Sequence, residues 1–331
     1  MYTLKECTCS KVICSRRPKR SPPAAKTAPL KENIVSKNFL PVSLDDSQAY
    51  YELWQRTPQR SLDYTLANLW GWQDYYGLEW CFDDNLCWIR QTRPYQICWA
   101  PVGDWNAVDW KSLLPCSFSE TAHTIVRVPE KLLHTWQEHL PGLVDPEEDR
   151  GQWEYLYKQE ELADLPGNRY HKKRNHYNSY IKTYGEPDYH SLDDAMVEDV
   201  LAVQDDWCQW HECEDSPSLR AENEAINRVL SHWNSFRGLV GGSLYVDGKM
   251  VAFSVGENLD GESLGVHYEK GLSGFKGVYQ TINCTFSRRA GEGFTYINRA
   301  QDLDEEGLRQ AKMTYLPADF LRKYKVSIRK A

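Results

Sequence analysis

Hydrophobic positions along this chain alternate between the spacing of helices and the spacing of strands. Tyr50 lies three and four residues before Leu53 and Trp54, so the three side chains would share one face of a helix. By this criterion we predict helices over residues 47–56, 63–73, 105–114, 130–140, 168–184, 191–210, 219–236, 277–290 and 307–313. Strands are predicted over residues 78–82, 86–90, 95–99, 124–128, 152–157, 239–246, 250–256, 263–268, 294–297 and 325–329.

Turn signals divide these elements into two similar halves. Asp83-Asp84-Asn85 predicts an antiparallel hairpin, Asp247-Gly248 predicts a second one with a type I′ turn, and Gly185-Glu186-Pro187 is a natural linker. Each half has the order helix, helix, antiparallel meander, helix, strand, helix, which resembles the GNAT class of acyltransferases. We therefore predict an α/β (α+β) protein of two tandem GNAT-like domains, residues 39–185 and 186–331, whose mostly antiparallel mixed sheets are flanked by helices.

Charge is distributed unevenly over the 331 residues, whose net charge is −8. Residues 1–38 carry nine Lys or Arg against two Glu, so the remainder carries −15. The segment 1–38 is also rich in proline, lacks apolar periodicity and has no apolar core of a signal peptide, which predicts a disordered basic tail. A body this acidic argues against general nucleic-acid binding, so any contact with tRNA or phospholipid needs a local basic patch.

Neither a membrane span nor a metal site is predicted. No apolar run approaches the roughly 18–20 residues that a membrane span requires, and we expect a cytoplasmic protein. The ten cysteines are not spaced like a secreted disulfide framework, which favours reduced thiols. Cys208, His211 and Cys213 offer too few ligands for a zinc signature, so packing is the better account of Cys208.

The most informative segment lies near the C-terminal end of the sequence. A predicted strand runs directly into Asn298-Arg299, an acidic turn with Asp302 follows, and a helix then carries Arg309 and Lys312. Strand ends that open onto a helix start are common ligand sites in α/β proteins. Because Arg309 and Lys312 are three residues apart, they could converge on one anion.

A second basic segment opens the helix predicted at residue 168, directly after Pro166-Gly167. Its basic side chains are Arg169, Lys172, Lys173, Arg174 and His176. In an acidic body this cluster predicts a site for phosphate or carboxylate groups. A solvated basic face explains the same composition, and the residues alone do not decide between the two.

The end of the strand at 263–268 carries the mixture His267-Tyr268-Glu269-Lys270. Glu269 and His267 could move a proton during attack by an amine, although a structural Glu–Lys pair is an equally good account. The glycine-rich turn 271–277 could hold phosphate oxygens or simply reverse the chain. No Ser-His-Asp order, HExxH or GxSxG motif supports a hydrolase.

Three blocks of the sequence resemble the phosphatidylglycerol lysyltransferase C-terminal domain family. They are residues 61–72 (SLDYTLANLWGW), residues 155–176 with LPGNRYHKKRNH at their end, and the positions VHYEK, GVYQ, IN, NR and GLRQAK between 266 and 312. The resemblance implies two tandem GNAT-like domains, and it implies similarity to Fem-type transferases that take an aminoacyl group from charged tRNA. Two positions depart from the family pattern, since Ala300 replaces a glutamate and Asp304 replaces a glycine.

From the blocks we expect an aminoacyl-tRNA-dependent acyltransferase with a small-molecule or peptide amine as acceptor, and peripheral anionic lipid as a less favoured one. Glu269 and His267 would be catalytic. Substrate or anion binding would involve Lys172, Lys173, Arg174, His176, Lys270, Tyr279, Asn283, Asn298, Arg299, Asp302, Arg309 and Lys312. Two alternatives stay open: an acetyl-CoA-dependent N-acyltransferase that uses the turn 271–277, and a non-catalytic protein that binds an anionic metabolite.

Overall fold

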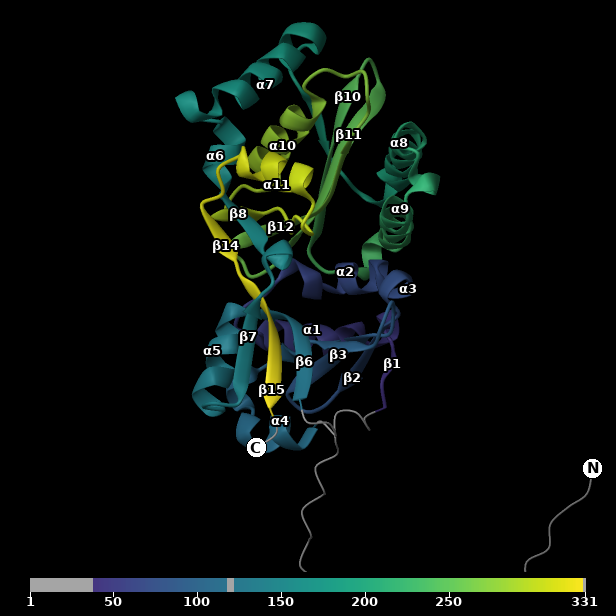
Figure 1. Cartoon of the computed structure of the whole chain (residues 1–331). Coiled ribbons are helices and arrows are strands. Elements are labelled where there is room, and N and C mark those ends of the chain that lie inside the picture. Colours follow the sequence, from purple (N-terminus) through teal and green to yellow (C-terminus); the bar gives the residue numbers. More distant parts are fainter. Residues whose placement is uncertain (1–37, 118–121, 330–331) are drawn as a thin grey trace, which may run out of the picture. The chain divides into compact units, whose positions relative to one another are not determined.

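The computed structural model describes residues 38–117 and 122–329, which form two β-sheets with helices packed on them (Figure 1). All of these residues fall within one compact unit. The basic tail expected over residues 1–38 lies, apart from Asn38, outside the described residues. Two mixed sheets flanked by helices confirm the predicted α/β (α+β) class.

The first sheet has the strand order β1-β2-β3-β4-β6-β15-β7, with β5 paired to β3. The β2-β3-β4 segment is the predicted antiparallel meander, and β4 lies parallel to β6. The strands are β1 (Leu40–Pro41), β2 (Leu78–Phe82), β3 (Leu86–Gln91), β4 (Ile97–Trp99), β5 (Val102–Gly103), β6 (Ala122–Pro129), β7 (Val144–Glu148) and β15 (Lys323–Arg329). The helices of this half are α1 (Ser47–Arg56), α2 (Leu66–Gly71), α3 (Gln73–Tyr76), α4 (Trp110–Ser117) and α5 (Glu130–His139).

The second sheet has the order β14-β8-β13-β12-β11-β10-β9. Its meander β10-β11-β12 is antiparallel, and β12 lies parallel to β13. The strands are β8 (Glu154–Lys158), β9 (Asp188–Ser191), β10 (Leu239–Val246), β11 (Lys249–Asn258), β12 (Ser263–Gly271), β13 (Tyr296–Asn298) and β14 (Asp319–Leu321). Its helices are α6 (Gln159–Asp164), α7 (His171–Tyr184), α8 (Val197–Trp210), α9 (Pro217–Leu230), α10 (Val278–Arg289) and α11 (Glu306–Met313).

The sheets exchange strands across the domain boundary that we expected at residue 185. Strand β8 precedes that boundary, yet it lies between β13 and β14 of the second sheet. Strand β15, the last in the chain, lies between β6 and β7 of the first sheet, as the yellow arrow in Figure 1 shows. Division into domains 39–185 and 186–331 stays a prediction, because each sheet contains a strand from the other range.

Both hairpins have the turns that their sequences require. Asp247 and Gly248 adopt φ values of +50° and +77° between β10 and β11, as a type I′ turn demands at both central positions. Asp83 closes the other turn, where its carboxylate accepts hydrogen bonds from the backbone N–H groups of Asn85 and Leu86. The many tryptophans mainly build core, and Trp80, Trp88 and Trp99 of the first sheet are all buried.

Several sequence predictions need correction at this level. The helix expected over residues 63–73 is broken into a 3-10 turn at Leu62–Tyr64 followed by α2 and α3. The helix expected from residue 191 begins at Val197, because residues 188–191 pair with β10 as β9. Strand β7 and helix α6 were not predicted, since Val144-Asp145-Pro146-Glu147-Glu148 has no strand-like alternation of apolar residues.

The cysteines at the end of α8 also differ from expectation. Cys208 and Cys213 form a disulfide, so the prediction of reduced thiols is wrong for this pair. His211 does not join them and instead stacks on Trp207, with 4.0 Å between the ring centroids. In residues 38–117 and 122–329, no group of three or more His, Cys, Asp or Glu side chains is arranged to hold a metal ion. Nor does that part of the chain contain a helix with the length and apolarity of a membrane span.

Candidate functional site

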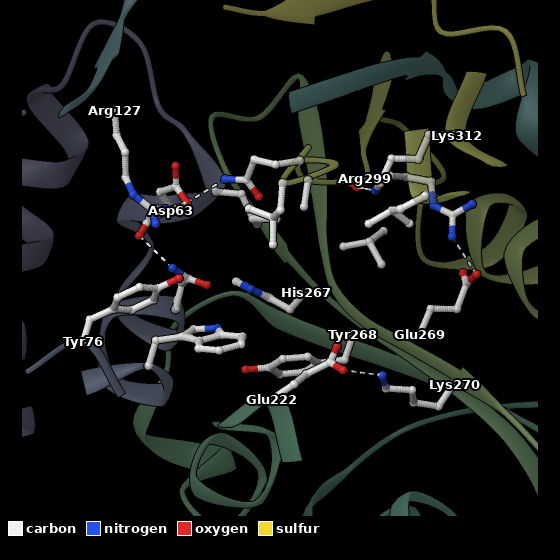
Figure 2. Close-up of a pocket in the computed structure, with 18 residues that line it drawn as sticks. Asp63, Tyr76, Arg127, Glu222, His267, Tyr268, Glu269, Lys270, Arg299 and Lys312 are labelled. Carbon is white, nitrogen blue, oxygen red and sulfur yellow. Dashed lines mark hydrogen bonds and ion pairs between the residues drawn. The ribbon is translucent and has the colours of Figure 1, made fainter. Parts of the chain in front are cut away.

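A cavity of about 360 Å³ lies where the parallel strands β12 and β13 part. Ladder pairs join the two strands at Ser263–Tyr296, Leu264–Ile297 and Gly265–Asn298. The chain segments that follow both line the cavity, with residues 266–270 from one and residues 299–301 and 303 from the other. Its remaining walls come from α9, α11 and the first half of the chain around Asp63 and Arg127 (Figure 2). The end of the strand pairing thus creates a space into which several polar side chains project.

One wall of the cavity holds Glu269, Arg299 and Lys312. The Arg299 guanidinium donates to Oε1 of Glu269 at 2.6 Å, and both side chains are largely buried. The Lys312 ammonium donates to the backbone carbonyl of Arg299. Burial of the ammonium, reinforced by the charge of Arg299, lowers the pKa of Lys312 to about 7. Lys312 therefore titrates near neutral pH, unlike an ordinary surface lysine.

A second wall carries an ion pair between Lys270 and Glu222. The Lys270 ammonium donates to Oε2 of Glu222, on α9, at 2.7 Å. The same ammonium lies 3.8 Å from the centroid of the Trp207 ring, on α8. Lys270 is 5% exposed, so its charge is held by this pair and this ring rather than by water.

His267 lines the cavity from β12 and has a buried carboxylate behind it. Its Nε2 lies 3.0 Å from Oε2 of Glu257, and both side chains are only 2% exposed. Figure 2 shows the imidazole in the middle of the cavity, between the Asp63 side and the Glu269 side. A carboxylate on one ring nitrogen fixes the orientation of the imidazole and favours a proton on that nitrogen, which leaves the other nitrogen as an acceptor.

The opposite wall is part of a buried polar network that joins the two halves of the chain. Asp63 accepts hydrogen bonds from Arg127 at 2.5 Å and from Gln301 at 2.6 Å, and it also pairs with Lys323 of β15. Lys323 in turn donates to Glu154 of β8 at 2.6 Å. Favourable pairing with Arg127 and Lys323 outweighs the effect of burial and lowers the pKa of Asp63. Residues from both halves of the chain therefore line one cavity, and the buried network holds the two halves together there.

The structure brings five of the predicted site residues into this cavity: His267, Glu269, Lys270, Arg299 and Lys312. Two others lie next to it. Asn283 directs its amide toward Oε2 of Glu269 at 3.5 Å. The Tyr279 hydroxyl accepts a hydrogen bond from Trp207 at 2.7 Å.

Three more predicted residues line a separate hollow of about 530 Å³ at the start of α7. Lys172, Lys173 and His176 lie there, together with Arg169 and His171. One residue of the hollow and one of the cavity contact the same buried ring, that of Tyr315. The Lys173 ammonium lies 3.9 Å from the centroid of that ring, and the Arg299 guanidinium lies 5.6 Å from it. Burial and the charge of Arg299 lower the pKa of Lys173.

The remaining predicted residues are occupied by contacts within the chain. Arg174 donates to the backbone carbonyls of Leu165 and Gly167, at 2.5 and 2.9 Å, and so caps the segment after α6. The amide of Asn298 donates to Glu154 at 2.6 Å in the buried network. Both differ from the substrate contacts that we expected, which therefore stay predictions.

Asp302 and Arg309 bind each other rather than a shared anion. Arg309 donates to both oxygens of Asp302 at 2.9 Å and to Asp304 at 2.7 Å, while Tyr155 and Arg150 also donate to Asp302. Burial alone would raise the pKa of Asp302, but the hydrogen bonds from Arg309 and Tyr155 lower it to about 2. Convergence of Arg309 with Lys312 on one ligand would require these pairs to break, so that role remains a prediction.

The sequence did not single out Glu222, Trp207, Arg127 or Asp63 as site residues. Glu222 and Trp207 lie on amphipathic helices, where a polar or aromatic side chain gives no local sign of a site. Arg127 adopts φ +56° where β4 and β6 part, the place in the first half that corresponds to Arg299 in the second. The duplicated element order was the one signal that could have identified it. Asp63 belongs to the first block of the family resemblance.

Comparison with known proteins settles the family. The model of the family described as phosphatidylglycerol lysyltransferase, C-terminal, matches residues 54–327. The chain belongs to this family. Membership confirms the resemblance found in the sequence and relates the chain to transferases.

Two sets of relatives extend this result. A conserved protein of unknown function from Bacteroides thetaiotaomicron superposes with a TM-score of 0.79 and 29% identity, over 88% of this chain and 99% of that one. The C-terminal domain of a putative lysylphosphatidylglycerol synthetase from Agrobacterium fabrum gives a TM-score of 0.60 at 13% identity, over 87% of this chain and 92% of that one. L-PGS from Bacillus licheniformis gives a TM-score of 0.60 at 12% identity, over 86% of this chain and 92% of that one. The last two share the fold.

One curated relative matches in sequence over a shorter stretch. An uncharacterised protein of Mycoplasmoides gallisepticum is 23% identical over 180 residues. The match spans 53% of this chain and 56% of that protein.

Proposed function

We propose that this chain is an aminoacyltransferase that moves an aminoacyl group from a charged tRNA to an amine or hydroxyl acceptor. One observation carries the proposal: a cavity of mixed charge and a basic hollow each place a cationic side chain, Arg299 and Lys173, on the ring of Tyr315. The cavity would hold the aminoacyl ester and the acceptor. The hollow would hold phosphates of the tRNA acceptor end. Family membership supports a transferase, and the L-PGS neighbour supports the same fold for it.

The hollow has the chemistry that phosphate groups require. Lys172, Lys173 and His176 lie together at the start of α7, and Lys172 is exposed. Because the chain carries a net charge of −8, a local basic hollow is where an anion would gather rather than elsewhere on its surface.

The side chains of the cavity would each have a role in acyl transfer. Protonated Lys312 would stabilise negative charge on the ester carbonyl oxygen as the acceptor attacks it. Among the described residues, Oε2 of Glu269 has only the contact from Asn283 at 3.5 Å, so it can accept a hydrogen bond from the donor α-ammonium. Glu269 and His267 were the two candidates for moving a proton. Since Arg299 holds Glu269 while Glu257 orients the His267 ring, the geometry supports His267.

In the proposed reaction the acceptor N–H or O–H gives its proton to His267 as its nitrogen or oxygen bonds to the ester carbon. The bond between that carbon and the terminal ribose oxygen of the tRNA then breaks. His267 returns the proton to that oxygen, so that deacylated tRNA and the aminoacylated product leave. No redox partner or cofactor is needed for this balance.

Acetyl-CoA as the donor finds less support because helix α7 covers the turn at 271–277. The Tyr184 hydroxyl accepts from the backbone N–H of Lys276 at 3.2 Å and donates to the carbonyl of Gly274 at 3.3 Å. A Cβ on Gly277 would overlap the carbonyl of His176. Tyr184 therefore uses a backbone N–H group that a pyrophosphate would need, and α7 lies against the same turn.

Thermal melting of the full chain with charged and uncharged tRNA tests the proposal. A charged tRNA at about 100 times its dissociation constant should stabilise the chain by about 2.7 kcal/mol. Lys172→Glu should weaken this binding by about tenfold, because it reverses a charge in the hollow. Lys182→Glu, on the same helix but outside the hollow, should leave it unchanged. If acetyl-CoA stabilises the chain by this amount and no tRNA stabilises it, the proposal is refuted.

A further inference from the structure

Every carboxylate that lines the cavity in the described part of the chain already has a basic partner. Asp63 pairs with Arg127 at 2.5 Å, and Glu269 pairs with Arg299 at 2.6 Å. The third pair joins Glu222 to Lys270 at 2.7 Å. Lys312, the other charged side chain of the lining, is itself basic. A donor that brought a second ammonium beyond its α-amino group would find no unmatched negative charge.

The third pair has a particular geometry. A carboxylate beside the face of a tryptophan is an arrangement that binds ligand ammonium groups, through an ion pair and a cation–π contact together. Here Glu222 supplies the carboxylate, Trp207 supplies the ring, and the ammonium of Lys270 already occupies the position between them. Lys270 comes from β12, three residues after His267, so the chain fills this position from within the site.

We propose that Lys270 acts as a built-in counter-ion that excludes cationic donors, so that the aminoacyl group this chain transfers carries an uncharged side chain. The inference rests on the proposed aminoacyl transfer and names the class of donor. Lys270 is then a residue that determines specificity, and Glu222 with Trp207 are its supports.

The neighbouring lining suits an uncharged group. Tyr268 lies between His267 and Lys270 with its side chain beside Glu222 (Figure 2) and is 4% exposed. Its hydroxyl has no hydrogen-bond partner among the described side chains and backbone groups. An unpaired buried hydroxyl is costly unless a ligand atom pairs with it. Leu62, Val266 and Ala300 complete an apolar part of the lining.

The test compares donors on the full chain. Alanyl-, seryl-, lysyl-, arginyl- and aspartyl-tRNA, each charged separately, would be offered with the same amine and hydroxyl acceptors. We expect transfer from at least one uncharged donor to exceed transfer from lysyl- and arginyl-tRNA by about tenfold or more, since like charges would meet at Lys270.

A gain of function should accompany removal of the counter-ion. Lys270→Met should raise the ratio of lysyl to uncharged transfer by about tenfold, because Glu222 becomes available to the donor ammonium. The double variant Lys270→Met/Glu222→Gln should lose this gain. Lys249→Met removes an exposed lysine of β11 that pairs with Asp206 and should leave the ratio unchanged. Should Lys270→Met fail to fold, Lys270→Gln is the alternative, with the same expected direction.

The outcomes separate this inference from the proposed function. If the unmodified chain transfers lysine or arginine as well as any uncharged amino acid, or prefers an acidic one, the inference is wrong while aminoacyl transfer stands. If Lys270→Met folds and gains no lysyl transfer, the counter-ion role is wrong. If no aminoacyl-tRNA is a donor and none stabilises the chain, both proposals fail.

Discussion

The ammonium of Lys312 lies against the Arg299 carbonyl, in a place where its charge is poorly solvated. Folding thus brings the pKa of Lys312 to about 7. An amine that titrates near pH 7 can stabilise an oxyanion when protonated and exchange protons readily. The same burial makes the stability of the fold depend on pH.

We expect Lys312 to make the folded chain more stable as pH rises above 7. Its pKa is about 7 when folded and near 10.5 when unfolded, so the unfolded chain binds more protons between these values. Between pH 7 and 9 the free energy of unfolding should rise by about 1 kcal/mol relative to Lys312→Met, allowing for partial exposure. Urea unfolding of both proteins at the two pH values measures this. A constant difference between them would contradict the shifted pKa.

Asp302 should contribute strongly to the free energy of unfolding, whereas Asp304 should contribute little. Asp302 is fully buried and accepts from Arg150, Arg309 and Tyr155. Asp302→Asn leaves these donors with a neutral partner and should cost about 3 kcal/mol in the free energy of unfolding. Asp304→Asn is the matched control, because Asp304 is 70% exposed and pairs with the same Arg309, and it should cost about 1 kcal/mol or less.

The effect of Asp302 also has a definite pH range. Its folded pKa of about 2 lies below its ordinary value, so its stabilising contribution is complete above about pH 4. The contribution is lost as pH falls toward 2, and Asp302→Asn should not show this loss. Equal acid sensitivity of the two proteins between pH 4 and 2 would show that other carboxylates dominate there.

At the scale of elements, α7 is the link between the basic hollow and the rest of the site. Its first turn carries Lys172 and Lys173, and its last residue, Tyr184, bonds the turn before α10. Contact between α7 and that turn is close at Gly277, which has φ +81° and lies against the carbonyl of His176.

Gly277→Ala should therefore disturb the packing of α7 on α10, at a cost of about 2–4 kcal/mol in stability. Gly274→Ala is the control in the same turn. It has a similar φ of +90° but open space around the missing Cβ, so it should cost only about 1 kcal/mol. Chemical denaturation of the two variants measures the difference. Equal costs would mean that α7 does not rest on this turn.

The elements were largely predictable where local sequence determines them. The β10–β11 hairpin follows from Asp247-Gly248, and α1 follows from the spacing of Tyr50, Leu53 and Trp54. Strand exchange was not predictable, because Glu154 of β8 and Lys323 of β15 meet only through pairing between distant segments. For the same reason, the sequence identified His267 and Lys270 as a polar group at a strand end but not their partners Glu257 and Glu222.

At the scale of the whole described chain, the buried network makes the two sheets depend on each other. Lys323 of the first sheet is fully buried between Asp63, in the 3-10 turn of the first half, and Glu154, in β8 of the second sheet. We expect one cooperative unfolding transition in which tryptophan fluorescence and far-UV circular dichroism coincide. Two separate transitions would support independent domains at 39–185 and 186–331.

Lys323→Met should destabilise the whole fold rather than one half. It would leave two buried carboxylates without a shared partner, at a cost of about 3–5 kcal/mol. Lys325→Met is the control on the same strand, because Lys325 is 43% exposed and lies 3.9 Å from Asp149. That variant should change the free energy of unfolding by about 0.5 kcal/mol or less.

The most direct test of the central proposal is transfer itself. The full chain would be incubated with a mixture of radiolabelled aminoacyl-tRNAs and defined acceptors: a primary amine, a peptide amine and phosphatidylglycerol micelles. We predict that label leaves tRNA faster than by spontaneous hydrolysis and appears in an aminoacylated acceptor. His267→Ala should reduce this by about 100-fold or more, as for loss of a general base. Label that leaves the tRNA no faster than in the absence of protein, with every acceptor present, would contradict aminoacyl transfer.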